Sequence, residues 1–226
     1  LLMAKEKMKK LDTLGEEITN SITHGIGSLL SIAALVIMIV VAAIHNNTMG
    51  VVTSSIFGAS LIILYTMSTL YHAISNKKAK KILRLFDHCT IYLLIAGTYT
   101  PYTLVALRSI DPAKGWMIFS IVWGIAIFGT LFYLLFKNKF KILNVISYIV
   151  MGWVVLIALP EVLSFFTINN AMPGLYLLVA GGIAYTVGVI FYALQNLNLR
   201  YFHSIWHLFV LAGSICHFLS VTLYIL

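Results

Sequence analysis

The sequence predicts an all-α protein: a seven-transmembrane helix bundle with its N-terminus in the cytoplasm and its C-terminus outside. Composition, the length of the apolar runs and the distribution of basic residues lead to this prediction. Of the 226 residues, 61% are apolar and only 10% are charged. Soluble domains are about 45–50% apolar and about 25% charged. The composition therefore excludes an ordinary soluble enzyme, a disordered chain and a nucleic-acid-binding protein.

Seven apolar runs are each long enough to cross a bilayer, because a hydrocarbon core of about 30 Å needs roughly 20 helical residues. In order they cover residues 22–44, 51–74, 82–107, 116–136, 142–163, 174–194 and 202–226. The segments between them are short and polar, and they read HNNTMG, SNKKAKK, RSIDPAK, KNKFK, SFFTINNAMP and QNLNLR. Since backbone groups cannot stay unpaired in lipid and no alternating barrel pattern occurs, the runs must be helices. We expect a cytoplasmic tail over residues 1–21 and one membrane domain over 22–226.

The basic residues predict the orientation. If the helices alternate in direction, the N-terminal tail and the second, fourth and sixth connectors share one side. These segments hold 13 of the 15 Lys and Arg residues, and only Arg108 and Lys114 fall on the other side. Lys and Arg accumulate on the cytoplasmic side of membrane proteins, where they also contact anionic lipid. The chain is therefore expected to be a multi-pass protein of the cell membrane.

Ionisable residues in the spans gather near one leaflet. His72 lies near the end of the second span, Asp87 near the start of the third, and His203 and His207 at the start of the seventh. All four belong to the predicted cytoplasmic side. The residues that lead into the first span on the same side are Glu16, Glu17, Asn20 and His24. Because ionisable groups inside a membrane are costly and rare, these residues are candidates for function.

The histidine spacing indicates a metal site. His203 and His207 are four positions apart, so both rings point from one helix face. Together with His72 they would form a three-histidine zinc site with an open fourth position. Zinc lowers the pKa of a water in such a position to about 7. Asp87 could orient or deprotonate that water, or it could accept a hydrogen bond from one of the histidine ligands. Ser68, four residues before His72, could supply a hydroxyl.

Structural interpretations of the same residues stay open. His203 and His207 could be interfacial side chains that reach towards water, and Asp87 could pair with Arg84 one turn earlier. Ser68 could serve helix packing instead of chemistry.

Other polar and small residues also have structural interpretations. Capping of the first helix is an alternative role for Glu17, Asn20 and His24. Hydrogen bonds between helices are the expected role of His88 and His217, and close helix approach that of Gly181 and Gly182.

Three segments resemble a known family. EEITNSITHGIG (16–27) resembles its Glu-x2/3-Asn-x3-His signature. STLYH (68–72) and FDHCTIYLLIAGTYTPY (86–102) resemble its Ser-x3-His and Asp signature, and HSIWHLFVLAGSICHF (203–218) resembles its closing His-x3-His signature. In this order they are similar to the hemolysin III family of bacterial membrane proteins, which is related to the progestin and adiponectin receptors and to alkaline ceramidases.

The resemblance implies a zinc ion held by His72, His203 and His207. It also implies that Asp87 is the acid that approaches zinc through a water and that Ser68 is the neighbouring hydroxyl. In the ceramidase-like relatives such a centre is associated with hydrolysis of lipid amides.

Three functions are therefore open. The first is a zinc-dependent hydrolase of a lipid amide or ester, with a membrane lipid or fatty-acyl substrate. The alternatives are a membrane-lytic or pore-forming hemolysin, and a non-enzymatic sensor of the lipid state that contains structural zinc.

Overall fold

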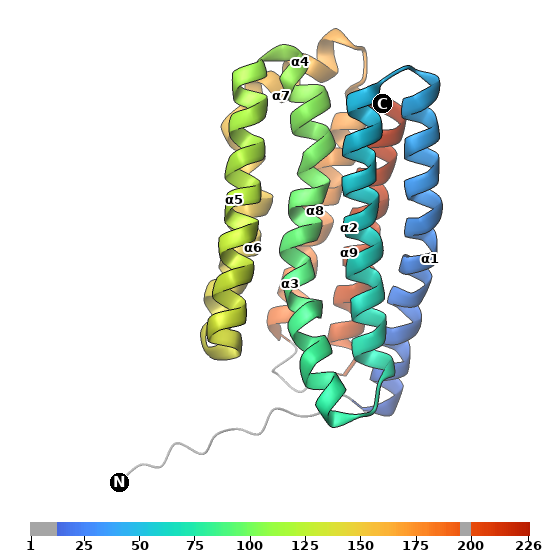
Figure 1. Ribbon diagram of the computed structural model, residues 1–226, viewed down its shortest axis with the longest axis vertical. Coiled ribbons are helices and arrows are strands. Elements are labelled where there is room, and N and C mark those ends of the chain that lie inside the picture. Colours follow the sequence, from blue (N-terminus) through green and yellow to red (C-terminus); the bar gives the residue numbers. More distant parts are fainter. Residues whose placement is uncertain (1–12, 195–199) are drawn as a thin grey trace.

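A computed structural model describes residues 13–194 and 200–226, and the described chain is helical throughout (Figure 1). Within these residues, seven helical spans are long and apolar enough to cross a membrane, which confirms the predicted all-α class with seven spans, while the side of the membrane on which each terminus lies stays a prediction. The predicted tail falls largely outside the described residues, and so does most of the sixth connector.

The seven spans follow the predicted order. The single-helix spans are α1 (Leu14–Ile44), α2 (Thr48–Ala73), α5 (Pro112–Phe136), α8 (Met172–Leu194) and α9 (Phe202–Tyr224). The third span comprises α3 (Lys77–Pro101), η1 (Tyr102–Leu107) and α4 (Arg108–Ile110). The fifth comprises α6 (Lys141–Gly152), η3 (Val154–Ala158) and α7 (Leu159–Ile168), and η2 (Lys137–Phe140) precedes it. Apolar side chains exposed to the surroundings cover much of the outside of the bundle, as a lipid-facing surface requires.

A capping box sets the start of α1 earlier than the predicted Ile22. The Thr13 hydroxyl accepts a hydrogen bond from the Glu16 backbone N–H at 3.3 Å. In return, the Glu16 carboxylate accepts one from the Thr13 N–H at 2.7 Å. The alternative in which Glu17, Asn20 and His24 cap this helix is therefore wrong, because all three lie inside it.

Two spans contain irregular backbone. Pro101 has no N–H to donate to the preceding turn, and the π-helix η1 follows it directly. The fifth span breaks between α6 and η3. There the Tyr99 hydroxyl donates to the Gly152 carbonyl at 2.7 Å and accepts from the Val155 N–H at 2.9 Å. Tyr99 thus supplies partners for two backbone groups at the break, which a membrane interior otherwise leaves unpaired.

Glycine allows α8 and α9 to approach closely. A Cβ atom on Gly181 would lie 2.6 Å from Nε2 of His217, and one on Gly213 would lie 2.7 Å from the Tyr185 ring. The prediction of close approach is confirmed at Gly181. It is wrong at Gly182, where an added Cβ would meet nothing within 4 Å.

The helix ends that carry the candidate site residues meet at one end of the bundle. Figure 1 shows the start of α1, the connector from α2 to α3 and the start of α9 at this end, while the C-terminus lies at the other. We call it the basic end, because the start of α3 there holds Lys77, Lys78, Lys80 and Lys81.

Candidate metal centre

The structure brings three histidines together at the basic end. His72 comes from the last turn of α2, and His203 and His207 come from the first two turns of α9. One ring nitrogen from each lies within 4.8 Å of the others. The Nε2 atoms of His203 and His207 are 3.1 Å apart, and the ring centroids of His72 and His207 are 5.0 Å apart. The predicted trio therefore forms one group, although its members are far apart in the sequence.

Three imidazole nitrogens are a donor set that zinc accepts, and a group that spans up to 4.8 Å would close slightly around a single ion. Nitrogen ligands at about 2.0–2.1 Å from tetrahedral zinc lie roughly 3.3 Å from each other, close to the spacing between His203 and His207. His72 Nε2 is buried and has no hydrogen-bond partner among the described residues, as expected of a lone pair that faces a metal. The group contains no fourth protein ligand from the part of the chain that the structure describes. Three ligands with a fourth position open is the pattern of catalytic zinc sites.

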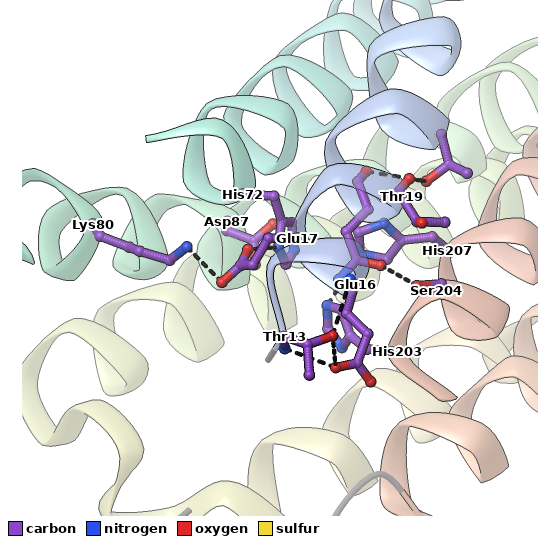
Figure 2. Close-up of polar contacts among 12 residues, drawn as sticks. Thr13, Glu16, Glu17, Thr19, His72, Lys80, Asp87, His203, Ser204 and His207 are labelled. Carbon is purple, nitrogen blue, oxygen red and sulfur yellow. Dashed lines mark hydrogen bonds and ion pairs between the residues drawn. The ribbon is translucent and has the colours of Figure 1, made fainter. Parts of the chain in front are cut away.

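The carboxylate of Glu17, which is not one of the three clustered histidines, accepts a hydrogen bond from His72. Figure 2 shows Glu17 between His72 and Lys80. Its Oε2 accepts from Nδ1 of His72 at 2.7 Å, and its Oε1 accepts from Nζ of Lys80 at 2.6 Å. In the sequence, Glu17 is a candidate for function or for capping the helix, but the sequence does not predict this contact with His72. The sequence signal for this role was the position of Glu17 itself, an acidic residue in a helix that continues into the first span. A charged side chain at such a position is costly.

Asp87, the predicted acid, lies outside the group of three. It is on α3 at the same end, and its carboxylate is 3.5 Å from Nδ1 of the neighbouring His88. The alternative ion pair between Asp87 and Arg84 is absent from the ion pairs of the described residues. The role of supporting a ligand, one of those considered for Asp87, falls geometrically to Glu17.

Several buried polar atoms beside the trio have no hydrogen-bond partner among the described residues. The His24 ring stacks on the His207 ring, and neither of its nitrogens has one. Asn20 accepts from the Ser204 hydroxyl at 2.5 Å, but its Nδ2 has no partner. The Ser68 hydroxyl, one turn before His72, is buried and also lacks one. Buried unsatisfied groups are rare in proteins and often mark a bound ion or ordered water.

His88 and His217, which were predicted to form hydrogen bonds between helices, make long contacts with neighbouring helices. His88 Nε2 lies 3.5 Å from the Tyr192 hydroxyl on α8, while its Nδ1 lies 2.9 Å from the Arg84 carbonyl of its own helix. His217 Nδ1 lies 3.4 Å from the Tyr102 hydroxyl. Both residues therefore link helices, as predicted, but through weak hydrogen bonds.

An apolar cavity of about 190 Å³ lies inside the bundle, and its lining includes none of the three histidines of the group. Trp206, the residue before His207, and Val210, one turn after it, line the cavity, and His217 lines it further along the same helix. His207 and His217 are ten residues apart, which is about 15 Å along a helix. Tyr102 and Val155 also line the cavity, so both irregular spans face it.

The fold and the site define a class: a seven-helix membrane protein with a buried three-histidine group at one end of the bundle. The chain belongs to the haemolysin-III-related family, whose model matches residues 13–218. It is 43% identical to Hemolysin-3 of Bacillus cereus over 98% of this chain and 97% of that protein. It is 44% identical to the Hemolysin-3 homolog of Bacillus subtilis (strain 168), over 94% of this chain and 95% of the relative.

A human relative extends the comparison beyond bacteria. The chain is 29% identical to the monocyte to macrophage differentiation factor of Homo sapiens, over 94% of this chain and 86% of that protein. The family resemblance inferred from the motifs is confirmed. With its seven candidate spans, the protein is a multi-pass protein of a bacterial cell membrane.

Proposed function

We propose that this protein is a zinc-dependent hydrolase that cleaves an amide or ester bond of a membrane lipid. The observation that carries the proposal is the grouping of His72, His203 and His207, with an apolar cavity in the same bundle that is lined by Trp206 and Val210, the neighbours of His207 on α9. When bound, zinc would polarise a carbonyl and lower the pKa of a water to about 7.

The three histidines would hold the ion. Neighbouring side chains would stabilise the charge on the carbonyl oxygen and transfer the proton. The buried Ser68 hydroxyl would donate a hydrogen bond to the carbonyl oxygen as negative charge develops on it. Asp87 would accept a proton from the water whose oxygen bonds to the carbonyl carbon. As the carbon–nitrogen or carbon–oxygen bond breaks, the same carboxyl group would return the proton to the leaving amine or alcohol. The products are a fatty acid and the released amine or alcohol.

The cavity provides a place for the acyl chain. The part of its wall formed by Leu64, Trp206 and Val210, which precede or follow the histidines on α2 and α9, is apolar. A chain lying there would place its carbonyl at the level of the histidine group and its methyl end deeper in the bundle. Such sites, mostly apolar with a few convergent polar groups, are typical of binding sites for small molecules.

The test is hydrolysis of a panel of labelled ceramides, acyl amides and acyl esters by purified protein in mixed micelles. We expect release of fatty acid from at least one class, with His207→Ala reducing the rate to background. His45→Ala is the matched control, because His45 lies at the far end of α1 from the group. Equal turnover by the parent and His207→Ala would contradict the proposal.

Membrane lysis is a second candidate, supported by the name of the Bacillus cereus relative. It requires oligomers and an aqueous path through the membrane. Leakage of small but not large dyes from liposomes, unaffected by removal of zinc, would favour lysis over hydrolysis. Retention of all dyes at high protein-to-lipid ratio would exclude it.

A structural zinc ion in a non-enzymatic lipid sensor is the third candidate. Its support is that the ligands come from α2 and α9, so that one ion would cross-link two helices. This function predicts that removal of zinc lowers the melting temperature while no lipid of the panel is cleaved.

A further inference from the structure

We propose that Glu17, held by Lys80, is a positioning residue that prepares His72 for metal binding. The strength of zinc binding would then depend on α1 and on the start of α3, neither of which supplies a ligand. This inference rests on the proposed function, because it assumes that the trio holds zinc.

Glu17 uses one carboxylate oxygen for each partner. Oε2 accepts from His72 and Oε1 from Lys80, at 2.7 and 2.6 Å. The His72 side chain is completely buried, while the Glu17 side chain is 19% exposed. Both contacts have the length of strong, charge-assisted hydrogen bonds. The carboxylate therefore fixes the His72 ring from the side opposite the histidine group.

The contact also selects the tautomer of His72. A neutral imidazole carries one proton, and the nitrogen without it is the metal ligand. Because Nδ1 faces a carboxylate, the proton belongs on Nδ1 and the lone pair on Nε2. It is Nε2 that is buried without a hydrogen-bond partner. A histidine ligand that donates its other N–H to a carboxylate is a common arrangement at zinc sites, where it orients the ring and raises its basicity.

Lys80 completes the arrangement. Its ammonium group compensates the Glu17 charge near the membrane boundary, where an uncompensated carboxylate is costly. It also lies 5.2 Å from the centre of the Tyr71 ring, whose edge meets the His72 ring with centroids 4.6 Å apart. Residues from α1, α2 and α3 thus hold one another around His72.

Other carboxylates nearby have different partners. Glu16 serves the capping box and accepts from the Tyr201 backbone N–H at 2.8 Å, which ties the start of α1 to the start of α9. Asp87 lies against His88. Glu17 accepts a hydrogen bond from a member of the trio, and Glu16, whose carboxylate caps α1 and accepts from Tyr201, is the control.

The experiment measures zinc affinity, independently of any activity, by competition with a chromogenic chelator. The variants are Glu17→Ala, Glu17→Gln and Lys80→Met, with Glu16→Gln as the control. Loss of a carboxylate behind a metal ligand typically weakens metal binding about 10–100-fold, and we expect this loss for Glu17→Ala. Glu17→Gln should lose less, since its amide oxygen can still accept from Nδ1. Lys80→Met should also lose less, because the carboxylate remains. Glu16→Gln should lower the melting temperature and leave the zinc Kd unchanged.

Each result decides a question. If Glu17 only ties helices together, Glu17→Ala will lower the melting temperature of the zinc-free protein at an unchanged Kd, and the inference is overturned. Should Glu17→Ala fail to fold, an unchanged Kd in Glu17→Gln and Lys80→Met would overturn it instead. If the parent protein binds no zinc, the proposed function fails with it. Tight binding by the parent and by every Glu17 variant would contradict this inference alone.

Discussion

The His24 ring lies flat on the His207 ring, with their centroids 3.6 Å apart and their planes 9° apart. This contact joins α1 to α9 directly behind the histidine group. His24 is almost completely buried, and its edge also meets the Tyr65 ring at 5.0 Å. The first helix therefore supports the candidate centre twice, through Glu17 on His72 and through His24 on His207.

Replacing His24 separates its packing from its polarity. His24→Ala removes the stacked ring and should lower the free energy of unfolding by about 2–4 kcal/mol, as for other large-to-small core changes. His24→Phe keeps a flat ring and should retain most of the stability, because neither nitrogen of His24 has a hydrogen-bond partner in the described structure. Thermal unfolding in detergent compares the two. Equal losses would show that the nitrogens, and not the stacking, carry the contribution.

Removal of zinc should loosen the contact between α2 and α9. A ligand that binds only the folded state stabilises it by about 2.7 kcal/mol at a concentration one hundred times its Kd. We therefore expect added zinc to raise the melting temperature of the chelated parent, and more at higher zinc concentrations. His207→Ala should show no such rise, and His45→Ala should behave as the parent does. A rise of equal size in His207→Ala would place the zinc elsewhere.

Tyr99 should stabilise the break in the fifth span. Tyr99→Phe leaves the Gly152 carbonyl and the Val155 N–H without their partner, at a cost of about 1–3 kcal/mol for buried groups. Tyr102→Phe is the matched control, because the contacts of the Tyr102 hydroxyl with His217 are long, at 3.4 and 3.5 Å, and reach no backbone group at the break. Chemical unfolding of the two variants should show the larger loss for Tyr99→Phe. Equal losses would mean that the backbone at the break finds other partners.

The sequence predicts the spans and the histidine group for identifiable physical reasons. Apolar runs must match the bilayer thickness, and alternation of the spans brings His72 to the end of the bundle that holds His203 and His207. The hydrogen bond from His72 to Glu17 could not be predicted in this way. Hydropathy gives the depth of a residue in the membrane, but the rotation of each helix about its axis depends on packing between side chains. For the same reason the sequence placed Asp87 at the right end but not relative to the trio.

Helix breaks were hidden for a related reason. The run from Ile142 to Leu163 reads as one apolar span, and apolar residues suit a regular helix and an irregular segment equally well. The break at Gly152 depends on Tyr99, a residue of another span. Prolines were the local signals: Pro101 directly precedes the π-helix, and Pro160 lies in the first turn of α7, after the irregular segment of the fifth span.

Gly181 and Gly182 provide a paired test of helix packing beside the cavity. An alanine at 181 would place its Cβ 2.6 Å from the His217 ring, so α8 and α9 must separate or the ring must move. Overpacking of this kind typically costs about 1–3 kcal/mol. Gly182→Ala adds a methyl group where nothing lies within 4 Å and should leave the melting temperature unchanged or slightly higher. The double variant Gly181→Ala/His217→Ala should recover part of the loss, because the second change removes the ring that clashes. If Gly181→Ala is as stable as Gly182→Ala, the two helices do not depend on this close contact.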